Sequence, residues 1–220
     1  MGRFNLNKGQ TFNLSKESGL SKIRVELGWK SGADLDACAF LLGSDGTIQN
    51  NADFVFYNSE NREQPFDRQK FLNKKNWRAK TRPMSADGSV LGSLDDLGDE
   101  DEGEDASEEM HVDLNKVDPS VTEIVFWVTI YKGDTKGTTF GSVRNPYISI
   151  INEESDEELC RYNLNENFSQ ETAVVAGSLL CDENGDWNFQ ATGQGYMGGM
   201  QGLIDIYAGW LLRAFDDGWR

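Results

Sequence analysis

The chain has 220 residues, of which 38% are hydrophobic, so it is long enough for about one large domain with a substantial core. Its formal net charge of −16 makes nucleic acid a poor partner, because so acidic a protein has little to exchange for the counterions of a phosphate backbone. The polar start predicts no signal peptide, and no stretch approaches the roughly 18 apolar residues that span a bilayer. Three scattered cysteines, Cys38, Cys160 and Cys181, are typical of reduced thiols, so we expect a cytoplasmic protein.

Most of the chain has the pattern of short strands and turns. Ile23, Val25, Leu27 and Trp29 alternate with polar residues or glycine, which is the period of a half-buried strand. We expect about nine strands, at residues 23–29, 37–42, 53–57, 110–114, 123–131, 146–152, 158–164, 172–181 and 187–192. The stretch 123–131 is the most apolar and should be central. Many short strands with 23 glycines predict an all-β fold, a two-sheet β-sandwich.

The last part of the chain, residues 200–220, has a different period. Its apolar residues recur every three or four positions and predict an amphipathic helix of about four turns: Met200, Leu203, Ile204, Tyr207, Trp210, Leu211, Ala214 and Phe215. We expect this helical tail to pack on the sandwich or on a partner chain. Binding to a membrane surface is the less favoured alternative, because Asp205, Asp216 and Asp217 would meet anionic lipids.

Residues 59–94 form a basic insertion. Within it, residues 60–82 carry eight lysines or arginines against three acids. An exposed and partly mobile loop is the simplest interpretation, and a surface for an acidic partner or for the protein's own acidic loop is the alternative. A nucleic-acid surface is less favoured in so acidic a chain.

The acidic stretch 95–109 packs ten carboxylates into fifteen residues without a lysine or arginine. Neighbouring carboxylates repel, and a bound divalent cation would reverse that effect. Calcium prefers six to eight oxygen ligands, which such a loop can supply, whereas magnesium usually keeps several waters; the spacing is not that of an EF-hand. Asp34 and Asp36 could add further oxygens. A solvated acidic loop without metal remains the alternative.

Several motifs resemble the tellurium-resistance TerD domain family. Residues 27–42 are similar to its glycine-tryptophan and Asp-Leu-Asp-Ala motif, and Asp53–Asn58 resembles its third strand. Further similarities lie at 125–131, 140–143 and 187–196. The resemblance covers residues 1 to about 205, and it implies a two-sheet β-sandwich that binds calcium at one end and acts in bacterial stress and tellurite resistance.

The resemblance also implies the calcium ligands. The family's acidic loop falls on residues 94–106, where Asp99 and Asp101 replace glycines and Ala106 replaces an acid, so that Glu108 or Glu109 could substitute for the lost carboxylate. The expected metal ligands are Asp34, Asp36, Asn58, Asp95, Asp96, Glu100, Glu102, Glu104, Asp105 and Glu108.

We therefore expect a TerD-like β-sandwich over residues 1–205, with the basic insertion at 59–94 and an acidic metal loop at 95–109, followed by a helical tail at 200–220. Its expected function is calcium-dependent and non-enzymatic: calcium orders the acidic loop, which then presents a surface to protein partners of a stress-response complex. Association of those partners with a membrane is left open. The single His111 provides no base for a nucleophile. The alternative is a metal-independent interaction module that acts through the basic insertion and the tail helix.

Overall fold

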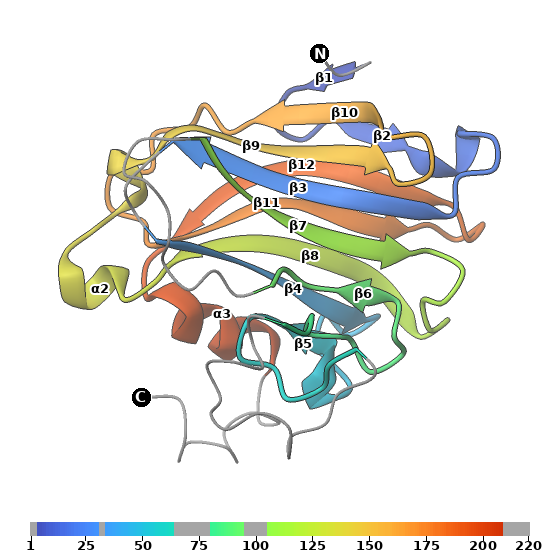
Figure 1. Cartoon of the computed structure of the whole chain (residues 1–220), viewed down its shortest axis with the longest axis horizontal. Coiled ribbons are helices and arrows are strands. Elements are labelled where there is room, and N and C mark those ends of the chain that lie inside the picture. The colour runs from blue at the N-terminus through green and yellow to red at the C-terminus, as the bar shows by residue number, and fades with distance from the viewer. Residues whose placement is uncertain (1–3, 31–33, 64–79, 95–104, 209–220) are drawn as a thin grey trace.

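The computed structural model describes residues 4–30, 34–63, 80–94 and 105–208, which form two six-stranded sheets packed face to face (Figure 1). Sheet A has the order β1 (Phe4–Leu6), β10 (Glu157–Asn163), β9 (Arg144–Asn152), β3 (Lys22–Lys30), β7 (Asp105–Asp113) and β6 (Val90–Leu91). Sheet B has the order β2 (Thr11–Asn13), β12 (Trp187–Tyr196), β11 (Ala173–Cys181), β8 (Val121–Ile130), β4 (Leu35–Gly43) and β5 (Phe54–Val55). All the strand pairs are antiparallel except β1 with β10.

In the described part of the chain, five short helical elements interrupt the strands. Three are single 3₁₀ turns, η1 (Leu14–Lys16), η2 (Asn51–Asp53) and η4 (Phe140–Ser142). The α-helices are α2 (Gly133–Lys136), which follows β8, and α3 (Gly199–Tyr207), which follows β12. No helix in the described ranges is long and apolar enough to cross a bilayer.

The main core lies between the sheets and is built by the strand alternation. Val25 and Leu27 of β3 face Leu41 of β4 and Phe126 of β8 across the sandwich, in one cluster of buried side chains. Because successive residues of a strand point to opposite faces, the intervening side chains of β4 and β8 lie on the outer face of sheet B. There they form a second apolar cluster with α3. β4 and β8 are therefore buried on both faces, which explains their nearly continuous apolar sequence.

Two connecting segments close the open sides of the sandwich. The N-terminal segment adds β1 to the edge of sheet A and then β2 to the edge of sheet B. On the other side, the chain after β5 returns to sheet A as β6. Arg62, only 2% exposed, fixes this second segment by donating hydrogen bonds to the carbonyl oxygens of Tyr57, Ser59 and Thr81.

The prediction of a two-sheet β fold is confirmed, as is the central position of β8. Three strands were not predicted, namely β1, β2 and β6, which have only two or three residues each. The predicted strand at 53–57 is shorter, because η2 covers Asn51–Asp53 and β5 has two residues. Of the predicted tail helix, α3 covers Gly199–Tyr207, and residues 209–220 lie outside the described residues.

Two expectations need correction. The acidic stretch was expected to be a loop over residues 95–109, but its last five residues belong to β7 and pair with β3. Pairing with β3 is favourable for this acidic segment because the side chain of Arg24 on β3 forms an ion pair, at 3.4 Å, with the carboxylate of Glu109. An exposed loop was the simplest interpretation of residues 60–82, yet Arg62 and Thr81 at its ends are buried. Residues 64–79 of the insertion lie outside the described residues.

Candidate metal-binding end of the sandwich

The candidate site lies at the end of the sandwich where β3 ends, β4 begins and β7 begins. Lys30 of β3 is paired with Asp105 of β7 in sheet A, and Leu35 of β4 is paired with Ile130 of β8 in sheet B. The backbone amide of Tyr131 donates to the carbonyl oxygen of Asp34 at 2.8 Å. Sheet pairing therefore fixes the residues that flank the acidic stretch and the Asp-Leu-Asp motif at one end, the left of Figure 1.

Two of the predicted ligands, Asp36 and Glu108, lie near the start of β4. Glu108 has the same strand parity as Met110 and Val112, which are buried between the sheets, so its side chain also points toward sheet B. Its Oε2 accepts a hydrogen bond from the backbone amide of Ala37 at 2.5 Å. Asp36 precedes Ala37 and stands on the outer face of sheet B. The two carboxylates thus lie on either side of the same short piece of β4.

The charges of both carboxylates affect the pKa of the Cys38 thiol. Its pKa is raised well above the usual value, first by complete burial and then by the charges of Asp36 and Glu108. A thiol with a raised pKa stays protonated at neutral pH and is a poor metal ligand. The donors at this end are therefore carboxylate and amide oxygens, which suit a hard cation such as calcium rather than zinc.

Asn58 belongs to the same part of the molecule. Its neighbour Tyr57 contacts Tyr131 edge to face, with ring centroids 6.3 Å apart. Tyr131 in turn is bonded to the backbone of Asp34. Asp34 is exposed, and Asn58 is half-buried. Asp34, Asn58 and Tyr131 therefore lie at the same end of the sandwich.

Two lysines at this end were not predicted. The Nζ atoms of Lys132 and Lys136 lie 5.1 and 5.3 Å from the ring centroid of Tyr131, within the range of a cation–π contact. Lys132 is the N-cap residue of α2 and Lys136 is its last residue, and α2 closely follows β8, the most apolar strand. The spacing of two lysines around one helical turn after Tyr131 is the only sequence signal that could have placed them there.

The remaining predicted ligands cannot be placed. Asp95, Asp96, Glu100, Glu102 and Glu104 lie outside the described residues, and the structure describes only the backbone of Asp105. Within the described ranges, no group of three or more histidine, cysteine, aspartate or glutamate side chains is arranged to hold a metal. The described residues therefore contribute part of an oxygen-rich site and not a complete one.

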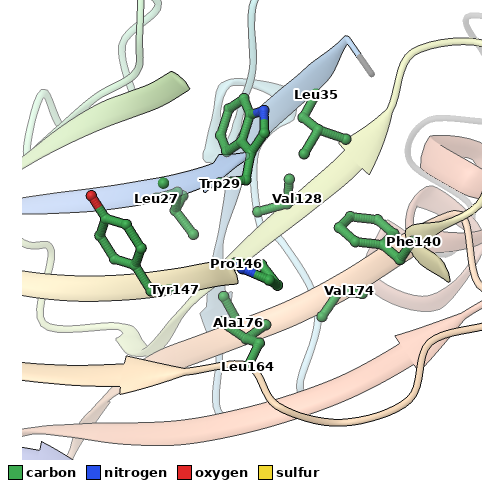
Figure 2. A pocket seen from close by; sticks show the side chains of 11 residues that line it. Leu27, Trp29, Leu35, Val128, Phe140, Pro146, Tyr147, Leu164, Val174 and Ala176 are labelled. Carbon is green, nitrogen blue, oxygen red and sulfur yellow. The ribbon is translucent and has the colours of Figure 1, made fainter. Parts of the chain in front are cut away.

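A small cavity opens between the sheets at the same end (Figure 2). It is lined by apolar side chains, including Leu35, Phe140 and Val174, and by Trp29 and Tyr147. Its volume of about 10 Å³ has room for one water molecule and none for an organic substrate. The Nε1 atom of Trp29 has no hydrogen-bond partner among the described residues. The cavity is a packing defect of the core and does not constitute a substrate pocket.

Another group of carboxylates lies at the opposite end. Asp87 accepts hydrogen bonds from the Ser85 hydroxyl at 2.6 Å, the Ser89 hydroxyl at 2.7 Å and the Asp118 amide at 2.9 Å. Burial raises the pKa of nearby Asp53, and the charge of Asp87 raises it further. These contacts hold the turn before β6 against the turn before β8, so we assign them a structural role.

The fold and this end of the molecule define a class: a two-sheet β-sandwich whose acidic segment is attached beside an Asp-Leu-Asp strand start. Comparison with known proteins identifies the family. The TerD domain model matches residues 2–207, and the chain belongs to the TerD domain family.

Relatives in this family are associated with stress and tellurium resistance. General stress protein 16U of Bacillus subtilis (strain 168) is 37% identical over 210 residues, covering 92% of this chain and 95% of that protein. Tellurium resistance protein TerD of Serratia marcescens is 34% identical over 209 residues, with the same coverage of 92% and 95%. A crystal structure of a homologue of telluride resistance protein (TerD) from Streptomyces coelicolor A3(2) has a TM-score of 0.50 at 18% identity, covering 86% of this chain and 96% of that one.

Proposed function

We propose that this protein binds calcium at the end of the sandwich that carries Asp34 and Asp36, and that calcium orders the acidic segment against them. The ordered segment then presents a surface to a protein partner in a stress or tellurite response. Asp34, Asp36, Asn58 and Glu108 would supply oxygens from the sandwich, and the carboxylates of residues 95–105 would supply the rest. The ion's role is electrostatic, since it offsets the mutual repulsion of these carboxylates.

The observation that carries the proposal is that Asp36 and Glu108 both lie at the start of β4, near the thiol of Cys38 and beside the strand β7 that leads out of the acidic segment. Sheet pairing holds the backbones of both residues, and the hydrogen bond to Ala37 also holds the side chain of Glu108. Oxygens held in this way lower the ordering cost that a wholly flexible acidic loop would have. The proposed ligands combine this fixed set with the more numerous carboxylates of the acidic segment.

We also propose that the protein is not an enzyme and acts on tellurite only indirectly. Burial raises the pKa of the Cys38, Cys160 and Cys181 thiols, which disfavours the nucleophilic thiolate. The Nδ1 atom of His111 lies 2.8 Å from a carboxylate oxygen of Glu153. That contact holds the imidazole on the surface of sheet A, and none of the three thiols has a described contact with it. A cytoplasmic location remains part of the proposal.

Thermal unfolding in excess chelator, in calcium and in magnesium tests the calcium proposal. A site in the folded state stabilises by about 2.7 kcal/mol at a hundredfold excess of ligand over the dissociation constant. For a chain of this size that corresponds to a rise in melting temperature of about 5–10 °C. We expect calcium to give this rise and magnesium to give much less.

Charge-neutral variants locate the site. Asp36→Asn should reduce the calcium-dependent rise, because it removes a ligand charge without changing side-chain size. Asp182→Asn is the matched control, since Asp182 lies in the turn between β11 and β12 at the other end of the sandwich. Equal melting temperatures in all three buffers would sink the calcium proposal and favour a metal-independent interaction module.

A further inference from the structure

Helix α3 covers the apolar outer face of sheet B. Leu203 is fully buried in a cluster with Cys38 and Phe40 of β4 and Trp127 of β8. The ring of Tyr207 lies 5.0 Å from that of Phe40 and 5.7 Å from that of Trp127, measured between centroids. Removal of the helix would expose large aromatic side chains that are completely buried. In Figure 1, α3 lies beside β4 and β8 on the side away from sheet A.

The helix is attached through a pair of glycines. Gly198 and Gly199, between β12 and the first turn of α3, have φ angles of +93° and +52°. Consecutive positive φ angles are readily adopted by glycine and strain other residues. Met197, just before the joint, is 73% exposed, so packing of its side chain does little to fix the joint.

A polar contact fixes this joint from outside the helix. The backbone amide of Gly199 donates to the hydroxyl of Thr172 at 2.9 Å, and that hydroxyl donates to Oδ1 of Asp134 at 3.1 Å. Thr172 is only 4% exposed, and its backbone is held by bonds to Ile130 and Tyr196. We call Asp134, Thr172 and Gly199 the Thr172 latch. It connects α2, sheet B and α3 at one point.

The far end of α3 has a single backbone attachment. The carbonyl oxygen of Tyr207 accepts a hydrogen bond from the amide of Ile48, in the turn after β4, at 3.0 Å. Within the described residues, the helix is thus held by its apolar face, by this bond and by the latch at the joint. The latch is the one of these three that lies at the joint itself.

We propose that α3 is a hinged cover of sheet B, which opens at Gly198 and Gly199 while the sandwich stays folded, and that the Thr172 latch sets how often it opens. Opening exposes the apolar face formed by Cys38, Phe40 and Trp127. The device works through hydrogen bonds at a glycine joint and does not depend on calcium.

The three native cysteines report the opening. Cys38 lies beneath α3, Cys160 is buried between the sheets, and Cys181 is partly exposed at the far end. Alkylation of the full-length protein by iodoacetamide in native buffer, with each cysteine followed by peptide mass spectrometry, separates the possible events. Alkylation of Cys38 measures opening of the cover, and alkylation of Cys160 measures global unfolding. Alkylation of the partly exposed Cys181 is the control for the activity of the reagent.

Thr172→Val removes the hydroxyl while nearly keeping the side-chain shape. We expect Cys38 to be alkylated about 5- to 30-fold faster, the factor for a loss of one or two hydrogen bonds, while the rate at Cys160 is unchanged. Asp134→Ala, at an exposed residue, should give a smaller acceleration of the same kind. Thr135→Val is the matched control, because its hydroxyl bonds only to the carbonyl of Lys132 within α2.

Two results would overturn the proposal. In one, Cys38 reacts at the same rate in Thr172→Val, Asp134→Ala and the unmodified protein. In the other, Cys38 and Cys160 accelerate together, which means that the helix opens only when the whole sandwich unfolds. Hydrogen exchange of residues 199–207 gives a second readout, which should be faster in the latch variants and unchanged in Thr135→Val.

Discussion

The carboxylate of Glu108 in sheet A accepts a hydrogen bond from the backbone amide of Ala37 in sheet B, so a residue predicted as a metal ligand also joins the two sheets. Ala37 lies in a part of β4 that extends past the end of its neighbour β5, because β5 pairs only with Ala39 and Phe40. Glu108 therefore supplies the acceptor that a longer β5 would have supplied to the edge of β4.

Two substitutions separate the roles of Glu108. Glu108→Ala leaves the Ala37 amide without this acceptor and should lower the free energy of unfolding by about 1–3 kcal/mol. Glu108→Gln keeps an acceptor oxygen and removes the charge, so it should cost less stability while still reducing the calcium-dependent rise in melting temperature. Urea unfolding with and without calcium measures both quantities. Equal stability losses in the two variants would argue against the hydrogen bond as the source of the effect.

Arg62 holds the segment between β5 and β6. Its buried guanidinium donates to several carbonyl oxygens and to the Thr81 hydroxyl at 2.8 Å. Arg62→Ala should lower the free energy of unfolding by more than about 3 kcal/mol, because several buried acceptors lose a charged donor at once. Arg144→Ala, at an exposed arginine of β9, is the control in chemical denaturation. A loss below 1 kcal/mol in Arg62→Ala, which is the range of an exposed contact, would contradict this assignment.

We expect the ionised carboxylate of Asp87 to contribute stability that is lost in acid. Burial pushes its pKa up, but hydrogen bonds from two serine hydroxyls and from the backbone amides of Ser89 and Asp118 outweigh burial and lower the pKa below the usual value. A carboxyl group with a lowered folded-state pKa stabilises above its unfolded pKa of about 3.9, and this stabilisation is lost as the pH falls through the folded-state pKa. Asp87→Asn should therefore cost about 1–2 kcal/mol at neutral pH and less in acid.

Urea unfolding of Asp87→Asn between neutral pH and about pH 3 checks this sign. The difference from the unmodified protein should shrink toward the acid end of the series. Glu154→Gln removes an exposed carboxylate from the turn after β9 and serves as the control. A difference that stays constant, or that grows in acid, would show that the charge of Asp87 does not produce the effect.

Gly28 is required by the ring of Tyr147. The two residues are paired across β3 and β9, and a Cβ atom on Gly28 would overlap that ring. On its other side the ring carries the guanidinium of Arg161, 3.4 Å from the ring centroid, so the ring cannot move away freely. Gly28→Ala should cost about 1–3 kcal/mol of stability.

A double-mutant cycle tests this close contact. In a Tyr147→Ala background, Gly28→Ala should cost little, because the ring that it would meet is gone. Equal costs of Gly28→Ala in both backgrounds would place the effect in the backbone of β3 instead.

Long apolar or alternating strands were predictable from sequence, and the shortest elements were not. β3 shows alternation over nine residues, and β8 combines ten residues with an almost continuous apolar run. β1, β2 and β6 are too short to show any period. They are strands because longer neighbours, β10, β12 and β7, offer them hydrogen-bonding edges.

The candidate site was predictable in its location and less so in its contacts. The Asp-Leu-Asp motif and the acidic stretch indicated one oxygen-rich end, and the structure places Asp36 and Glu108 on either side of the start of β4. Sequence could not show that Glu108 belongs to a strand, because the acidic run continues into β7 without a break in composition. Nor could it show the burial of Arg62, since an arginine in a basic segment is usually exposed.

The pairing of the N-terminal strands sets an order for folding during synthesis. Phe4 pairs with Cys160 and Phe12 with Phe189, so neither edge can form until more than 150 later residues have been translated. A nascent chain on the ribosome must therefore keep Phe12 from other contacts until β12 has emerged. Such late pairing slows folding and lengthens exposure to aggregation, so stalled or prematurely released chains should be strong chaperone clients.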